Sequence, residues 1–232
     1  MPKVVTKDLI KVYRTGKSEV IALRGLDMGV ADGELVAIQG PSGCGKTTLL
    51  NLIGGIDRPT AGRIEVDGTN LVDLSEGELV KYRRDRAGFV FQFFNLVPTL
   101  TAEENVQLPM RLASLDGATR ETRTAGLLKL VGLGGRAGHR PDELSGGEQQ
   151  RIAIAVALAN DPPLILADEP TGELDSKTGQ EILDLFKSLN RGLRKTVLVV
   201  THDTRVAQIA HRVLEIVDGK IVGERGGESP AP

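Results

Sequence analysis

Residues 35–53, LVAIQGPSGCGKTTLLNLI, combine an apolar strand, a glycine-rich loop and the start of a helix. Within them, residues 40–47, GPSGCGKT, satisfy the spacing G-x-x-x-x-G-K-[ST] of a phosphate-binding loop. Glycines allow backbone N–H groups to turn inward around a phosphate chain, and the N-terminus of the following helix adds a favourable dipole. A chance glycine-rich turn is disfavoured because the strand before it and the helix after it are both in place. The stretch therefore predicts a phosphate cradle in an α/β fold.

Two side chains of this loop are predicted to act on a bound nucleotide. Lys46 should reach the β- and γ-phosphates, and Thr47 should bind Mg²⁺. Cys44 also lies in the loop, where a small filler residue is favoured over a catalytic one. The expected nucleotide contacts are Gly40, Pro41, Ser42, Gly43, Cys44, Gly45, Lys46, Thr47 and Thr48.

Composition limits the classes of protein that the chain can represent. It has 232 residues, 40% of them hydrophobic, which suffices for one large domain with a real core. The formal net charge of −2 gives no basic field to attract nucleic acid. The single cysteine excludes an intrachain disulfide and a cysteine-based metal site, which fits a reducing cytosol. Apolar runs are strand-sized and the N-terminus lacks a signal peptide, so we expect a soluble chain whose membrane role comes from a partner.

Periodicity along the chain predicts alternating strands and helices. Short β-branched runs separated by Gly and Asp turns predict strands over residues 4–66, apart from a helix at about 46–53. The section from about Ser75 to Gly138 is predicted to form a mostly helical subdomain. From Ser145 onward, helical patterns alternate with apolar strands, which predicts parallel strands covered on both faces. The final ten residues, GERGGESPAP, lack periodicity and are expected to be disordered. Three capping boxes are predicted, at Ser75 with Glu78, Thr101 with Glu104, and Ser145 with Glu148.

Polar side chains follow three of the apolar runs. The segment LILADE, residues 164–169, ends in Asp168 and Glu169. A phosphate loop needs a carboxylate near its metal, so Asp168 fits the Mg²⁺ shell, directly or through water. Glu169 is placed to act as general base for the water that attacks the γ-phosphate. Gln92 and His202 follow two other runs, and both could face the γ-phosphate because ligands lie outside the carboxyl ends of parallel strands.

The segment LSGGEQQR, residues 144–151, predicts a helix start that contains two costly glycines. A capping box accounts for Ser145 and Glu148 within one chain. Gly146 and Gly147 each weaken a first helical turn by roughly 0.5–1 kcal/mol relative to alanine. We interpret them as giving an anion access to the bare backbone at this helix end.

Taken in order, GPSGCGKT, Gln92, LSGGEQQR, LILADE and His202 resemble the ATP-binding-cassette (ABC) ATPases over roughly residues 3–222. The resemblance implies an α/β P-loop NTPase with a RecA-like core of mixed, mainly parallel sheet. It also implies an N-terminal antiparallel β subdomain and a helical signature subdomain. The expected boundaries are one domain over 1–222, with its core at about 1–92 and 160–222, its helical subdomain at about 93–159, and a tail over 223–232.

The resemblance also implies roles for individual residues. Tyr13 would stack on adenine, although the alternative of a strand-end aromatic packed on the core is favoured without the family. Gln92 would sense Mg²⁺ and the attacking water, and His202 would contact the γ-phosphate. The implied catalytic residues are Lys46, Gln92, Glu169 and His202. The implied metal-site residues are Thr47, Gln92 and Asp168.

A second protomer would complete the site. By resemblance, the signature and D-loop residues of one chain close over the γ-phosphate held by the opposing chain. These residues are Ser145, Gly146, Gly147, Glu148 and Asp175. Glu173 departs from the pattern, since related chains often have Asn or Ala there, and its charge lies near the expected dimer contact.

Several segments narrow the resemblance to one branch. NLIGGIDRPTAGRI (51–64), FVFQFFNLVPTLTAEENVQLP (89–109) and DEPTGELDS (168–176) resemble lipoprotein-releasing and macrolide-exporting (LolD- and MacB-like) transporters. Polar amino-acid importers share much of the middle segment and stay an alternative. Phe93, Phe94, Leu96 and Leu100 form an apolar cluster that either docks a membrane partner or is buried in the core.

Two kinds of cassette ATPase compete: the motor of a membrane transporter, and a soluble enzyme acting on DNA or ribosomes. Only about a hundred residues separate the phosphate loop from the signature, with no sustained heptads and no cysteine pairs, which favours the transporter. A small-molecule kinase would not use LSGGEQQR. We expect ATP and Mg²⁺ as cofactors, an ATP-dependent homodimer, integral membrane permease partners and no nucleic acid. The expected location is the cytoplasmic face of the inner or plasma membrane.

Overall fold

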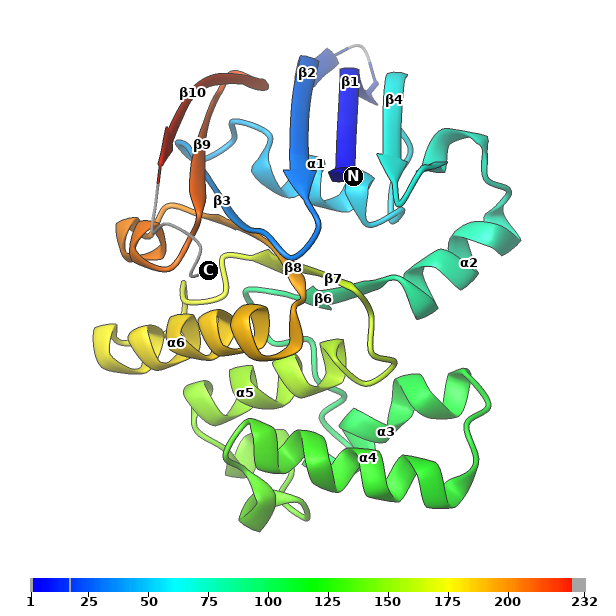
Figure 1. Ribbon diagram of the computed structural model, residues 1–232, viewed down its shortest axis with the longest axis vertical. Helices are drawn as coiled ribbons and strands as arrows, with labels where there is room; N and C mark the ends of the chain where they lie inside the picture. Colours follow the sequence, from blue (N-terminus) through cyan, green and yellow to red (C-terminus); the bar gives the residue numbers. More distant parts are fainter. Residues whose placement is uncertain (1, 17, 227–232) are drawn as a thin grey trace.

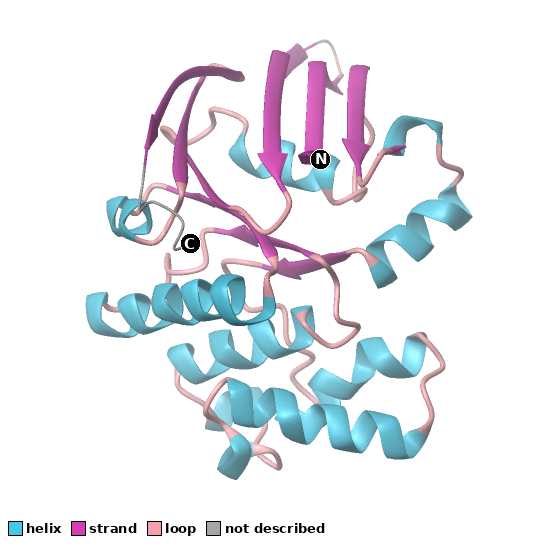
Figure 2. Cartoon of the chain, in the orientation of Figure 1, coloured by secondary structure: helices cyan, strands magenta, loops and turns pink. Residues whose placement is uncertain are grey.

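Four strands near the N-terminus form an antiparallel sheet in the order β2-β1-β4-β5 (Figures 1 and 2). Their bounds are Pro2–Thr15 for β1, Ser18–Ala31 for β2, Ala61–Val66 for β4 and Thr69–Asn70 for β5. The second half of β2 alternates between buried and exposed side chains, as expected when one face covers a core. The computed structural model describes residues 2–16 and 18–226.

Six strands form the central sheet, in the order β10-β9-β3-β8-β7-β6. Neighbouring strands are parallel except for β10, which pairs antiparallel with β9. All residues of β3 and β8 are buried, because both faces of the sheet are covered. The bounds are Leu35–Gln39 for β3, Ala87–Val90 for β6, Leu164–Asp168 for β7, Thr196–Thr201 for β8, Arg212–Val217 for β9 and Lys220–Gly226 for β10.

Helix α1, Lys46–Ile53, lies between the two sheets (Figure 1). Its leucines share one buried cluster with side chains of the antiparallel sheet, such as Leu26, and of the central sheet, such as Leu198. The helix that begins at the phosphate loop is therefore fixed by packing on both sides.

The remaining long helices cover the other face of the central sheet (Figure 1). Helices α5, Gly146–Ala157, and α6, Ser176–Leu193, pack on each other, with α3, Ala102–Leu112, and α4, Gly117–Leu130, beyond them. Phe186 of α6 and Met110 of α3 are fully buried in this second cluster. In the part of the chain that the structure describes, 3₁₀ turns join the elements at Leu71–Asp73, Gly134–Arg136, Pro141–Glu143 and Thr204–Gln208.

The predicted α/β architecture, with its antiparallel N-terminal sheet and mainly parallel central sheet, is confirmed. All three predicted capping boxes are present as well. No helix within residues 2–16 and 18–226 combines the length and the apolar character needed to cross a membrane.

Two expectations are corrected. The section from Ser75 to Gly138 is not one helical unit, because Leu79 and Tyr82 of α2, Glu76–Asp85, are buried with α1 and the antiparallel sheet. The expected disordered tail begins too early, since β10 continues to Gly226 and Glu224 accepts a hydrogen bond from Arg212 at 3.0 Å. The rest of that tail, 227–232, lies outside the described residues.

Candidate functional site

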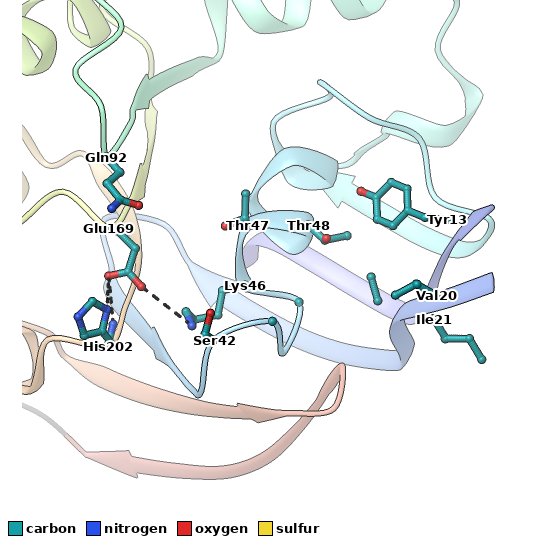
Figure 3. Close-up of a pocket in the computed structure, with 13 residues that line it drawn as sticks. Tyr13, Val20, Ile21, Ser42, Lys46, Thr47, Thr48, Gln92, Glu169 and His202 are labelled. Atoms are coloured by element: carbon teal, nitrogen blue, oxygen red, sulfur yellow. Dashed lines mark hydrogen bonds and ion pairs between the residues drawn. The ribbon is translucent and has the colours of Figure 1, made fainter. Parts of the chain in front are cut away.

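A cavity of about 680 Å³ opens over the phosphate loop (Figure 3). It lies at the carboxyl ends of β3, β7 and β8, where the sequence predicts a ligand. The lining residues are Tyr13, Val20, Ile21, Ala22, Ser42, Gly43, Gly45, Lys46, Thr47, Thr48, Gln92, Glu169 and His202.

The loop is shaped by contacts that only glycine allows. Gly45 has a φ of 104°, and a Cβ there would lie 2.5 Å from the carbonyl oxygen of Ala22. The loop therefore turns tightly against β2 before α1 begins. Cys44 is only 5% exposed and lies under the loop, which agrees with its predicted role as a filler.

Lys46 is held at the mouth of the cradle. Its Nζ donates to the carbonyl oxygens of Gly40 and Pro41, at 2.8 and 3.0 Å. The same atom lies 4.0 Å from Oε1 of Glu169 (Figure 3). Gly40 and Pro41 thus contribute to the site through their carbonyl groups, which orient the amine.

Oxygen atoms for a hard cation meet beside the cradle. Thr47 Oγ1 donates to Asp168 Oδ1 at 3.2 Å, which joins the first turn of α1 to the end of β7. Burial raises the pKa of Asp168, the neighbouring Glu169 raises it further, and the hydrogen bond from Thr47 opposes both effects. A hydroxyl and a carboxylate beside a phosphate cradle fit Mg²⁺, which prefers oxygen ligands and completes its shell with substrate phosphates.

The carboxylate of Glu169 is the most constrained side chain in the site. Its backbone is left-handed, with φ 45°, and its N–H donates to Val200 O at 2.8 Å. Oε2 accepts from Thr201 Oγ1 at 2.8 Å and from the backbone N–H of His202 at 3.1 Å. The imidazole Nδ1 of His202 also lies 3.1 Å from Oε2 (Figure 3). One oxygen is thus anchored to β8 while the other faces Lys46.

Gln92 lines the same cavity but is linked to a different segment. Its amide nitrogen donates to Oε1 of Glu173 at 2.8 Å. The loops after β7 and β8 are also joined, because Thr171 Oγ1 donates to Asp203 Oδ2 at 3.0 Å. The structure places the four predicted catalytic residues in the wall of one cavity: Lys46, Gln92, Glu169 and His202.

Tyr13 stands at the far end of the cavity and is 38% exposed, so it is not packed into the core. Its hydroxyl donates to Asp57 Oδ2 at 2.9 Å, and Lys11 Nζ lies 4.8 Å from the ring centroid. Lys11 also bonds Asp57 Oδ1 at 2.7 Å. Burial raises the pKa of Asp57, but hydrogen bonds from Lys11 and Tyr13 outweigh it and leave that pKa lowered. The ring is thus held in a fixed orientation at the rim.

The signature and D-loop residues do not line this cavity. Ser145 and Glu148 complete their capping box, with the N–H of Ser145 donating to Glu148 Oε2 at 2.9 Å. Glu148 also accepts from Arg136 at 3.1 Å. Asp175 is the N-cap of α6, and hydrogen bonds from Thr178 lower its pKa. Within one chain these side chains act as helix caps.

The interpretation of the two signature glycines is partly wrong. A Cβ on Gly147 would lie 2.3 Å from Cγ2 of Thr178 in α6, so packing inside the chain requires this glycine. Gly146 meets only ordinary contacts, the nearest being Leu174 at 3.5 Å. Packing therefore explains Gly147 but not Gly146, and access for an anion stays our prediction.

Sequence reasoning missed several residues of the site. Thr201 anchors Glu169, and its position just before His202 at a strand end was the available signal. Asp57 bonds Tyr13, which lies 44 positions away along the chain, and no local sequence pattern predicts such a contact. Three consecutive residues of β2 also line the cavity, namely Val20, Ile21 and Ala22, and Val20 lies beside Tyr13 (Figure 3). Their apolar strand pattern gave no signal of a binding site.

Comparison with known sequences shows extensive similarity. Residues 23–172 match the sequence model of the family described as ABC transporter. The uncharacterized ABC transporter ATP-binding protein MJ0796 of Methanocaldococcus jannaschii is 50% identical over 222 residues, which is 94% of each chain. The macrolide export ATP-binding/permease protein MacB of Hyphomonas neptunium is 46% identical over 230 residues. That match spans 99% of this chain but only 36% of MacB.

Solved structures agree with the sequence matches. A dimeric, post-hydrolysis structure of the MJ0796 cassette bound to ADP and Pi has a TM-score of 0.89 at 48% identity, covering 96% of this chain and 98% of that one. The cbiO1 structure from Clostridium perfringens, part of the ABC transporter complex cbiONQ, has a TM-score of 0.87 at 28% identity. It covers 97% of this chain and 88% of its own.

The contact between Gly147 and Thr178 yields a stability prediction. Gly147→Ala should lower the free energy of unfolding by about 1–3 kcal/mol, because the new methyl overlaps Thr178 Cγ2. Thr178→Ser removes that methyl while keeping the hydroxyl bond to Asp175, so adding it should restore most of the loss. Urea unfolding of the single and double variants measures both effects.

Gly146→Ala is the matched control in the same helical turn. It should be neutral or stabilising by about 0.5–1 kcal/mol, since alanine is the better helix former. The packing explanation is wrong if Gly147→Ala is as stable as Gly146→Ala.

Proposed function

This chain belongs to the ABC transporter family, and we propose that it binds and hydrolyses ATP as the motor subunit of a membrane transport complex. Its fold is that of the ABC ATPase cassettes. The observation that carries the proposal is the position of Glu169, anchored by Thr201 and His202 and aimed at Lys46 across the phosphate cradle.

In the proposed reaction, a water molecule attacks the γ-phosphorus and gives its proton to Glu169. The bond from the γ-phosphorus to the β,γ-bridging oxygen breaks, and ADP leaves with that electron pair. Lys46 neutralises charge on the phosphate oxygens, and His202 orients the γ-phosphate. Mg²⁺, held by Thr47, Gln92 and Asp168 with the phosphates, would neutralise further charge. The protein therefore contributes position and charge more than covalent chemistry.

Adenine would lie against Tyr13, at the end of the cavity opposite Glu169. The ring is partly exposed and one face is approached by Lys11, which leaves the other face for the base. The remaining loop residues, Ser42, Gly43 and Thr48, line the cavity between these two ends. The cavity could thus contact ATP along its full length, from the adenine base to the γ-phosphate, which supports ATP as the ligand.

We further propose that two chains form the working unit. MJ0796 crystallised as a dimer, and the signature end of α5 in this chain is solvent-exposed at Ser145. Ser145, Gly146 and Gly147 of one protomer would then face the γ-phosphate of the other, with Glu148 and Asp175 holding the two helix ends in shape. The domain limits of 1–222, with helices of about 93–159 forming the signature part, stay our prediction.

The membrane partner is proposed to dock in an apolar groove between α2, α3 and the end of α5. The groove is about 550 Å³ and contains the stacked rings of Phe89 and Phe91, 5.6 Å apart. Leu112, at its edge, is 74% exposed. The cluster predicted from sequence is divided: Phe93 is 70% exposed, whereas Leu96 packs against the core and Phe94 is half-buried.

The similarity to macrolide exporters supports export or lipoprotein release as the transport process. The similarity to cbiO1, part of the ABC transporter complex cbiONQ, leaves another class of transport as the second candidate. Such a partner would place this chain at the cytoplasmic face of the membrane.

Glu169→Gln tests the general base. The variant should keep ATP affinity and lose about 10²–10⁴-fold in kcat, because the amide cannot take the proton from water. Phosphate release and ATP binding measure the two effects, and Glu181→Gln on α6 controls for loss of one negative charge. Hydrolysis by Glu169→Gln at a rate near that of the native chain would overturn the assignment.

Ser145→Arg tests the dimer. The bulky cation should block the partner's phosphate site, so the monomer still binds ATP while ATP-driven dimerisation is lost and turnover falls about 100-fold. Sedimentation with ATP and phosphate release are the measurements. Ser145→Ala removes the same helix cap without the bulk and should still dimerise. Dimerisation of Ser145→Arg with ATP would contradict the proposed arrangement.

Leu112→Asp tests the docking groove. A charge on this exposed residue should spare folding and ATP binding but abolish co-purification with the proposed membrane permease, since an apolar interface excludes it. Val222→Asp, on exposed β10, is the control and should co-purify normally. Retained association of Leu112→Asp would place the docking surface elsewhere.

A further inference from the structure

The hydrogen bond between Gln92 and Glu173 joins two segments that lie 81 positions apart in the chain. Gln92 follows β6, and Glu173 lies in the loop between β7 and α6. The bond is 2.8 Å long and runs from the amide nitrogen to Oε1 of the carboxylate. None of the proposed catalytic steps uses Glu173.

The chemistry of this pair fixes which end of the amide faces the cavity. A carboxylate only accepts hydrogen bonds, so the atom beside Glu173 must be the NH₂ group of Gln92. The carbonyl end of the amide then points the other way. Figure 3 shows the amide oxygen of Gln92 on the side of Thr47 and its nitrogen on the opposite side. Gln92 thus turns its oxygen toward the side of the cavity where Thr47 lies, and the hydroxyl of Thr47 in turn bonds Asp168.

The loop that carries Glu173 is held independently of Gln92. Gly172 N–H donates to Glu169 O at 3.0 Å, and Leu174 N–H donates to Thr171 O at 3.2 Å. A Cβ on Gly172 would lie 3.4 Å from the amide nitrogen of Gln92, so the backbone packs directly under the amide. The carboxylate is therefore presented by a fixed turn.

We propose that Glu173 is a positioning residue for the cation site: it orients the amide of Gln92 so that oxygen, and not nitrogen, faces the Mg²⁺ bound with ATP. The inference rests on the proposed function. An amide at position 173 could donate or accept and would leave both orientations of Gln92 open, and an alanine would leave it without a partner. A carboxylate can only accept, so it holds the oxygen of Gln92 on the side of the cation before Mg²⁺ binds, and Mg²⁺ prefers oxygen ligands.

The expected effect is modest, because Glu173 is exposed and its hydrogen bond competes with water. Loss of the bond should weaken the gain in nucleotide affinity that Mg²⁺ confers by about threefold to tenfold. Affinity for nucleotide without metal should not change, since Glu173 does not line the cavity.

Calorimetric binding of the non-hydrolysable analogue AMPPNP, in Mg²⁺ and in EDTA, separates these effects without relying on turnover. Glu173→Gln and Glu173→Ala should lose affinity in Mg²⁺ and keep it in EDTA. Glu121→Gln, an exposed charge change on α4, should behave like the native chain in both buffers. Equal affinity of Glu173→Gln and the native chain in Mg²⁺ would overturn the proposal, and so would an equal loss in both buffers.

A double variant tests whether Glu173 acts through Gln92. Gln92→Ala should weaken the Mg²⁺-dependent gain, and adding Glu173→Gln should weaken it no further, because the amide to be oriented is absent. Additive losses would show that Glu173 acts by another route and would refute the positioning role. Failure of the proposed function itself is distinguishable, since the native chain would then show no Mg²⁺-dependent binding of AMPPNP.

Discussion

The parallel pairing of β3, β8 and β7 is the constraint on which the site depends. Their register places Ile38 beside Val200 and Val200 beside Asp168, so three strand ends reach the same edge of the sheet together. Each strand is followed by a part of the site: the phosphate loop follows β3, His202 follows β8 and Glu169 follows β7. A slip of register would separate groups that are now 3–4 Å apart.

Hydrogen bonds convert that shared edge into a rigid arrangement. Glu169 is in a left-handed conformation that costs free energy in a non-glycine residue. Its N–H donates to Val200 O, and its carboxylate accepts from Thr201 and His202, which together hold it there. One carboxylate oxygen is occupied by these donors while the other faces Lys46. The orientation of the proposed general base is therefore set by β8 before any substrate binds.

The signature helix illustrates how one sequence feature can have two causes. Gly147 is required because α5 approaches Thr178 of α6 too closely for any side chain. Gly146, one position earlier, meets no such limit and stays available for an intermolecular contact. Glu173 shows the reverse case. From the sequence, the negative charge of Glu173 is expected to lie near a dimer contact. Within the chain, its carboxylate accepts the hydrogen bond that orients Gln92.

The sequence by itself determined the phosphate loop, the three capping boxes and most of the alternation of strands and helices. It also determined that Lys46, Gln92, Glu169 and His202 would lie near one another. These depend on local spacing and periodicity, which the chain carries in short segments. Only the tertiary structure decided that α2 packs with the antiparallel sheet, that β10 extends to Gly226, and that Asp57 anchors Tyr13. Each of these joins residues that are distant along the chain, and such contacts depend on how whole elements pack, which no local pattern encodes.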